Sequence, residues 1–174
     1  RAVHDGLRRR VRSGAINAFE RDRSMARLHL TTAADDLRVS GLVVEAVFES
    51  FEVKREIFTK LDEICDEETI LARNTSSISL TKIAGCTGRA DRVIGMHFMN
   101  PVPLMKLVEI IRGFATSDDT FEMTRELAVN FKKTPIMAND FPGFISNRIL
   151  MPMINEAVFA LYEGVGTAEA IDGV

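Results

Sequence analysis

Between residues 41 and 138, short and almost uninterrupted apolar runs alternate with segments whose apolar residues recur at helical spacing. The first run, residues 41–47 (GLVVEAV), is rich in β-branched residues and has the length of a single strand. Strands that are apolar at nearly every position are buried on both faces, which is typical of a mostly parallel sheet covered by helices on both sides. The sequence therefore predicts the α/β class.

The expected elements follow one another at regular intervals. A helix is expected over residues 1–27, where apolar residues recur at helical spacing, and a short strand over 28–31. Further strands are expected over 41–47, 69–72, 92–98, 106–111 and 135–138, and helices over 51–65, 80–84 and 118–131. The sheet would therefore be built from strands joined mainly by helices.

The pattern changes after the strand that ends at residue 138. One long apolar helix is expected over 145–163, followed by a pair of glycines and a new helix from about residue 167. We therefore expect an α/β unit over residues 1–140 and the beginning of an all-helical unit over residues 141–174.

Composition excludes several classes of protein. Hydrophobic residues make up 46% of the 174 residues and charged residues 27%, which favours a folded domain over a disordered chain. The formal net charge of −3 argues against nucleic-acid and anionic-membrane partners. No apolar run reaches the ~18 residues of a membrane span. Cys65 and Cys86 form no metal-ligand or disulfide pattern, so we expect reduced thiols, a cytoplasmic location and no metal.

Polar residues follow the predicted strands where ligands bind in an open parallel sheet, beyond the carboxyl ends of the strands. His97 ends one apolar strand, and Glu109 lies twelve residues further on, in the next strand. The Asn-Pro-Val-Pro turn between them is rigid, because each proline fixes its own φ and restricts the residue before it. Such a turn can bring imidazole and carboxylate together as a general base for an alcohol. A structural histidine with satisfied hydrogen bonds is the alternative at this point.

Four segments of the chain resemble the signature blocks of one enzyme family. In order, they are residues 42–49 (LVVEAVFE), 74–77 (NTSS), 95–109 (GMHFMNPVPLMKLVE) and 140–148 (DFPGFISNR). The family is the NAD-dependent L-3-hydroxyacyl-CoA dehydrogenases, and the short bacterial 3-hydroxybutyryl-CoA dehydrogenases are the most similar branch. The resemblance implies a partial Rossmann-type doubly wound sheet, the dinucleotide-binding domain, followed by the start of an all-helical C-terminal domain.

The resemblance also implies an oxidoreductase that interconverts 3-hydroxyacyl-CoA, with 3-hydroxybutyryl-CoA expected, and 3-oxoacyl-CoA. His97 would be the catalytic base that takes the proton of the 3-hydroxyl, and Glu109 would stabilise the imidazolium as it forms. Ser76 would lie between cofactor and substrate, near the reacting oxygen. Asn147, at the start of the long helix, would help to hold the substrate.

The implied cofactor is NAD, with NADP left open. Glu49 and Lys54 resemble the family's contacts around the ribose, and Asn100 would contact the nicotinamide end together with Ser76. The hydride chemistry belongs to the cofactor, so these residues would supply orientation and charge.

Parts of the family pattern are not found in this sequence. The family opens with a strand, a G-x-G-x-x-G turn and a helix whose N-terminus binds the pyrophosphate. Gly164 and Gly166 do not supply this turn, because they follow a helix and Glu169 occupies the third glycine's place. Of the family's C-terminal helical domain, through which subunits dimerise, this sequence contains roughly the first helix. We therefore expect an internal segment of a longer homodimeric protein that is inactive by itself.

Arg73 also departs from the pattern, because a small residue is expected before the NTSS block. This arginine would either perturb the loop or face solvent. Two alternatives for the whole chain stay open: the dehydrogenase module of a multifunctional β-oxidation protein, and a non-catalytic relative of the same fold. The non-catalytic alternative predicts damage at the catalytic positions, whereas all four are intact. The sequence thus favours an enzyme of short-chain fatty-acid or butanoate metabolism.

Overall fold

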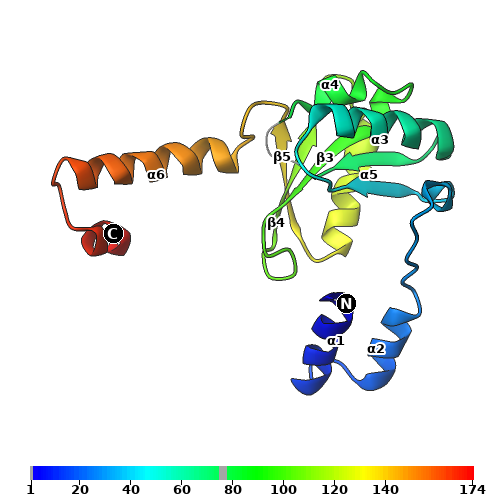
Figure 1. Ribbon diagram of the computed structural model, residues 1–174, viewed down its shortest axis with the longest axis horizontal. Helices are drawn as coiled ribbons and strands as arrows, with labels where there is room; N and C mark the ends of the chain where they lie inside the picture. Colours follow the sequence, from blue (N-terminus) through cyan, green and yellow to red (C-terminus); the bar gives the residue numbers. More distant parts are fainter. Residues whose placement is uncertain (1, 75–77) are drawn as a thin grey trace. The chain divides into compact units, whose positions relative to one another are not determined.

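The computed structural model describes residues 2–74 and 78–174, and the chain divides into two compact units, residues 1–36 and 37–174 (Figure 1). The first unit contains helices α1 (Ala2–Arg12) and α2 (Ala18–Met25). A short 3-10 turn, η1 (Ala34–Leu37), leads into the second unit. The second unit carries the sheet.

Two expectations for the first unit are wrong. The predicted single helix over 1–27 is two helices, because Gly14 adopts a left-handed φ of 72° after α1 and Asn17 caps α2. Residues 28–31 form no strand, and Leu30 in this segment is exposed. A strand needs a neighbour to pair its N–H and C=O groups, and none pairs with this segment in the described part of the chain.

In the part of the chain that the structure describes, the sheet of the second unit has five strands. They are β1 (Leu42–Glu45), β2 (Ile70–Arg73), β3 (Val93–Phe98), β4 (Leu107–Arg112) and β5 (Thr134–Asn139), in that order across the sheet. Three of the four pairings are parallel, and β3 with β4 is antiparallel. The connection of residues 99–106 is too short for the crossover that a parallel pair requires, so the chain turns back beside β3.

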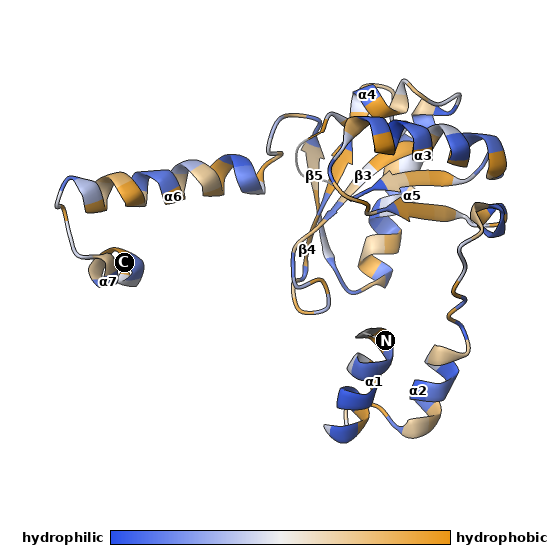
Figure 2. Ribbon diagram, in the orientation of Figure 1, coloured by the Kyte–Doolittle hydropathy of each residue, from blue (hydrophilic) through white to orange (hydrophobic). Residues whose placement is uncertain are grey.

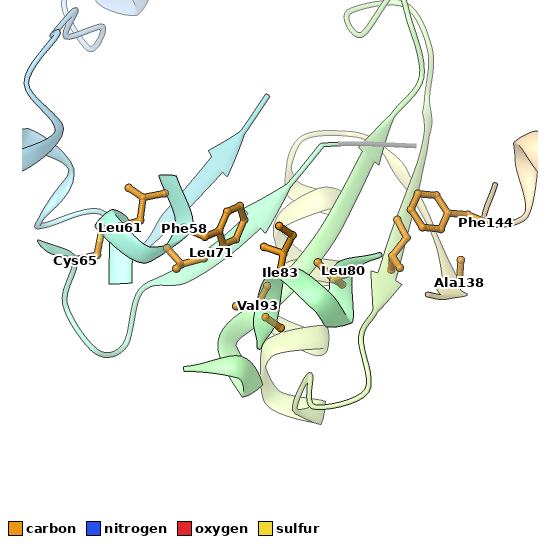
Figure 3. Close-up of a cluster of buried hydrophobic side chains, with 11 residues drawn as sticks. Phe58, Leu61, Cys65, Leu71, Leu80, Ile83, Val93, Ala138 and Phe144 are labelled. Atoms are coloured by element: carbon orange, nitrogen blue, oxygen red, sulfur yellow. The ribbon is translucent and has the colours of Figure 1, made fainter. Parts of the chain in front are cut away.

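Helices cover both faces of this sheet (Figure 1). On one face, α3 (Phe51–Ile64) and α4 (Leu80–Ala84) pack their side chains onto Leu71 and Val93 (Figure 3). On the other, α5 (Asp118–Asn130) packs Phe121 against Ile94. Successive strand residues point to opposite faces, so each strand contributes to both cores. Most of the strand ribbon accordingly has hydrophobic colours in Figure 2. The predicted partial Rossmann-type doubly wound sheet is confirmed.

Gly95 allows β3 and β4 to approach closely just before His97. It lies opposite Ile111, and a Cβ at position 95 would stand 2.7 Å from the Ile111 Cβ. Real Cβ atoms essentially never come this close. Glycine therefore fixes the spacing of the two strands that carry the candidate site.

The helical part begins with α6 (Ser146–Tyr162) and continues with α7 (Ala168–Gly173), which agrees with the predicted start of a helical domain. None of the α6 residues is buried, and large apolar side chains such as Ile149 and Phe159 are exposed. The domain boundary at residue 140 stays a prediction. No helix in the described part of the chain is both long enough and apolar enough to cross a membrane.

Candidate active site

His97 and Glu109 are directly opposite each other in the antiparallel pair of β3 and β4. Side chains at such positions share one face of the sheet, and here Nδ1 of His97 lies 2.7 Å from Oε2 of Glu109. The His97 side chain is 13% exposed and the Glu109 side chain 2%, so only the imidazole is open to solvent. The expected juxtaposition is thus observed, at the carboxyl end of β3.

Glu109 is held by more than the histidine. Its Oε1 accepts hydrogen bonds from the backbone N–H groups of Ile145 at 3.0 Å and Ser146 at 2.8 Å. Its Oε2 accepts the Ser146 hydroxyl at 2.8 Å. Burial by itself would raise the pKa of Glu109, but the hydrogen bonds from His97, Ser146 and Ile145 outweigh burial and lower the pKa. The carboxylate is therefore ionised.

The ionised carboxylate fixes the tautomer of His97. A carboxylate only accepts hydrogen bonds, so Nδ1 must donate its proton to Glu109, and the lone pair of the neutral ring is on Nε2. Phe144 meets the imidazole edge to face, with ring centroids 5.6 Å apart and an interplanar angle of 60°. The ring is therefore restrained from two sides, and Nε2 is the nitrogen that can accept a proton.

Asp140 anchors the segment that carries Phe144 and Ser146. Its carboxylate accepts the Ser79 hydroxyl at 2.7 Å and two backbone N–H groups at the start of α4, at 2.9 and 2.8 Å. Burial would raise the pKa of Asp140, but these hydrogen bonds lower it. The end of β5 is thereby tied to α4, and this restrains the turn that leads to α6.

Charged side chains alternate in sign at the carboxyl ends of β1 and β2. The Lys54 ammonium contacts Glu45 at 2.8 Å and Glu49 at 3.4 Å, and the Lys54 side chain is fully buried. Arg73 lies 3.9 Å from Glu49 and donates to the carbonyl oxygen of Ile78 at 2.7 Å. The Glu49 side chain is 38% exposed, so it is the member of this chain of charges that a ligand can reach.

Arg73 is also fully buried, so the suggestion that it faces solvent is wrong. Burial lowers the pKa of Arg73, and Glu49, Glu45 and Asp140 oppose that shift. Within the described residues, its Nε and Nη1 have no hydrogen-bond partner. Together, Arg73 and Glu49 hold both backbone groups of Ile78, since Glu49 accepts the Ile78 N–H at 3.3 Å. Arg73 therefore restrains the end of the loop that follows β2.

Asn147 and Asn100 are two further predicted site residues that the structure describes. Asn147 lies in the first turn of α6, directly after Ser146. Asn100 is exposed in the turn after β3. Ser76 lies outside the described residues. The structure thus brings His97 next to Glu109 and Glu49 next to Lys54, while the individual roles of all these residues stay predictions.

Sequence reasoning missed Ser146, Phe144 and Asp140. All three belong to the 140–148 block, in which Asp-Phe-Pro-Gly has the composition of an ordinary turn. Two signals pointed to that block, its resemblance to a signature block and its position at the carboxyl end of a predicted strand.

A hollow of about 920 Å³ lies at the amino ends of β2 and β3, the ends opposite His97, and Asp62, Asp66 and Arg89 line it. The Asp62 carboxylate already holds the Arg89 guanidinium at 2.6 Å. Within residues 2–74 and 78–174, no group of three or more His, Cys, Asp or Glu residues could hold a metal ion.

Two family models match consecutive parts of the chain. The model of the 3-hydroxyacyl-CoA dehydrogenase NAD binding domain matches residues 1–141. The model of the 3-hydroxyacyl-CoA dehydrogenase C-terminal domain matches residues 143–174.

Individual proteins match over nearly the same range. A 3-hydroxybutyryl-CoA dehydrogenase of Bradyrhizobium diazoefficiens is 48% identical over 98% of this chain and 58% of its own length. One of Clostridioides difficile is 52% identical over 82% of this chain and 50% of its own. The crystal structure of (S)-3-hydroxybutyryl-CoA dehydrogenase from Ralstonia eutropha aligns with a TM-score of 0.92 and 44% identity, over 95% of this chain and 59% of that one. The chain thus spans about half the length of the curated relatives it matches.

Proposed function

Because the chain belongs to the 3-hydroxyacyl-CoA dehydrogenase family, we propose that the protein interconverts 3-hydroxyacyl-CoA and 3-oxoacyl-CoA with NAD. The observation that carries this proposal is the His97–Glu109 pair, a restrained imidazole whose open nitrogen can accept a proton. We propose 3-hydroxybutyryl-CoA as the substrate, because the names of the relatives described above specify it.

His97 moves the proton in this reaction. During oxidation, Nε2 of His97 accepts the proton of the substrate's 3-hydroxyl, and the hydroxyl oxygen becomes the carbonyl oxygen of the 3-oxo product. Bound NAD would supply the acceptor for the hydride at C3. The ring is then an imidazolium whose Nδ1 lies 2.7 Å from the ionised Glu109, and this charge pair stabilises it. In the reverse direction, His97 returns the proton to the carbonyl oxygen.

The residues near Glu49 suit the ribose and nicotinamide end of the cofactor. The partly exposed Glu49 carboxylate at the carboxyl end of β1 can accept hydrogen bonds from ribose hydroxyls. Lys54 is buried and forms an ion pair with Glu49, so its contribution to cofactor binding would act through Glu49. The exposed amide of Asn100 after β3 can meet the nicotinamide end.

Further parts of the proposal follow from the resemblance. Ser76 would lie between cofactor and substrate, and Asn147, next to Ser146, would hold the substrate. A homodimer through the helical domain is supported by the exposed apolar side chains of α6. A cytoplasmic location is supported by two free cysteines, Cys65 and Cys86.

The proposed function is tested with the full-length protein, acetoacetyl-CoA and NADH. We expect oxidation of NADH with kcat of about 1–10³ s⁻¹, the usual range for enzymes, and much slower oxidation of NADPH. Absorbance of the reduced nicotinamide measures both rates. A protein that binds NADH without turnover would support the non-catalytic alternative and contradict the proposal. Hydration of crotonyl-CoA by the same chain would instead identify a multifunctional protein.

A further inference from the structure

Ser146 contacts both oxygens of the Glu109 carboxylate. Its hydroxyl donates to Oε2 at 2.8 Å, and its backbone N–H donates to Oε1 at 2.8 Å. Oε2 is the same oxygen that lies 2.7 Å from Nδ1 of His97. The serine hydroxyl and the imidazole are therefore two donors that share one acceptor atom.

The backbone before α6 explains why Ser146 reaches the dyad. Gly143 and Phe144 have positive φ values of 78° and 48°, so the chain turns sharply between β5 and α6. The residue before α6, Ile145, provides no side-chain cap. Glu109, from β4, accepts the N–H groups of Ile145 and Ser146 instead. The carboxylate thus serves the dyad and the first turn of α6 at once.

A hydroxyl that donates to a carboxylate stabilises the negative charge and makes the carboxylate less basic. A less basic carboxylate stabilises a neighbouring imidazolium less. From this geometry we infer that Ser146 is a positioning residue that sets the proton affinity of His97 through Glu109. The inference rests on the proposed function, since His97 has to release its proton again in every catalytic cycle.

Among the described residues, few other groups next to Glu109 could change the proton affinity of His97. From β3 the facing titratable group is His97, and the β5 residue paired with Glu109 is the apolar Ile136. From the start of α6 the facing groups are two backbone N–H groups and the Ser146 hydroxyl. Of the charged side chains in the described segments, only His97 forms an ion pair or hydrogen bond with Glu109.

The test removes the Ser146 hydroxyl in the full-length protein and follows two pH profiles. In Ser146→Ala, we expect the midpoint of the His97 titration, measured by NMR of the imidazole, to rise by about 0.3 to 1 pH unit. The midpoint of the acidic limb of the kcat/KM profile should move to higher pH by the same amount. Ser13→Ala, which removes an exposed hydroxyl, should leave both profiles unchanged.

A matched pair of larger variants guards against loss of folding in Ser146→Ala. Ser146→Thr keeps the hydroxyl and should titrate like the wild type, whereas Ser146→Val replaces that hydroxyl by a methyl group and should titrate like Ser146→Ala. An unchanged or lowered midpoint in Ser146→Ala, or identical midpoints in the Thr and Val variants, would overturn the inference. An inactive wild-type enzyme would contradict the proposed function. The NMR titration needs no turnover, so it would still test the role of Ser146 in such a protein.

Discussion

Replacing His97 by glutamine is expected to lower kcat by about 10²- to 10⁴-fold, the usual contribution of a general base, in the full-length protein. Glutamine fills a similar volume, and its amide can still bond to Glu109. It cannot, however, take up a proton from the 3-hydroxyl or return one to the 3-oxo group. NADH binding should change little, because His97 contacts the substrate oxygen in this account. Steady-state kinetics with acetoacetyl-CoA measure the first effect, and a fluorescence titration measures the second.

The matched control for this variant is His29→Gln, because the His29 side chain is 82% exposed. It should retain wild-type kcat. A His97→Gln enzyme with kcat within about threefold of the wild type would remove His97 from the mechanism. Loss of NADH binding together with kcat would instead indicate a cofactor-binding role.

Glu109→Gln is expected to lower kcat by a similar 10²- to 10⁴-fold, through the tautomer of His97. Two backbone N–H groups face Oε1, so the amide oxygen of the glutamine should take that place. The amide NH₂ then faces Nδ1 and donates to it, and the ring carries its proton on Nε2. An Nε2–H imidazole cannot accept the substrate proton, the same fault that follows when a triad carboxylate becomes an amide.

The stability of Glu109→Gln should fall by only about 1 kcal/mol at pH 7, because the serine hydroxyl and the imidazole can both reverse their hydrogen bonds. The Glu109 pKa is lowered in the folded state, so its stabilising effect is fully present above the ordinary glutamate pKa of about 4.3 and is lost as the pH falls from there through the lowered pKa of the folded protein. Urea unfolding at neutral and acidic pH should therefore show the difference between wild type and variant shrinking in acid. Glu122→Gln, at an exposed position on α5, is the control. Wild-type kcat in Glu109→Gln would contradict the orienting role.

The sheet could be predicted from the sequence because its strands are apolar on both faces and its helices are periodic. The structures of residues 28–31 and of residues 1–27 could not be predicted in this way. The first has strand-like composition without a neighbouring strand, and the second is divided by Gly14, whose left-handed backbone leaves no trace in the apolar spacing. The burial of Arg73 could not be predicted either, because arginine is a residue type that usually lies at the surface.

The centre of the candidate site could be predicted because His97 and Glu109 lie on consecutive strands joined by one rigid turn. Ser146 reaches Glu109 across 37 residues, and Asp140 reaches Ser79 across 61. These contacts depend on how β5 and α6 are placed against the earlier strands, and no local pattern encodes that placement. The resemblance supplied the block that contains Ser146, but not the hydrogen bonds that the block makes.

The tautomer of neutral His97 in the full-length protein, observed by ¹⁵N NMR and assigned with the His97→Gln variant, tests the proposed role of the dyad. We expect a proton on Nδ1, bonded to Glu109, and a lone pair on Nε2 that takes up a proton as the pH falls. We expect the opposite tautomer in Glu109→Gln. A wild-type ring with its proton on Nε2 would rule out His97 as the base, because the nitrogen that faces the substrate could then accept no proton.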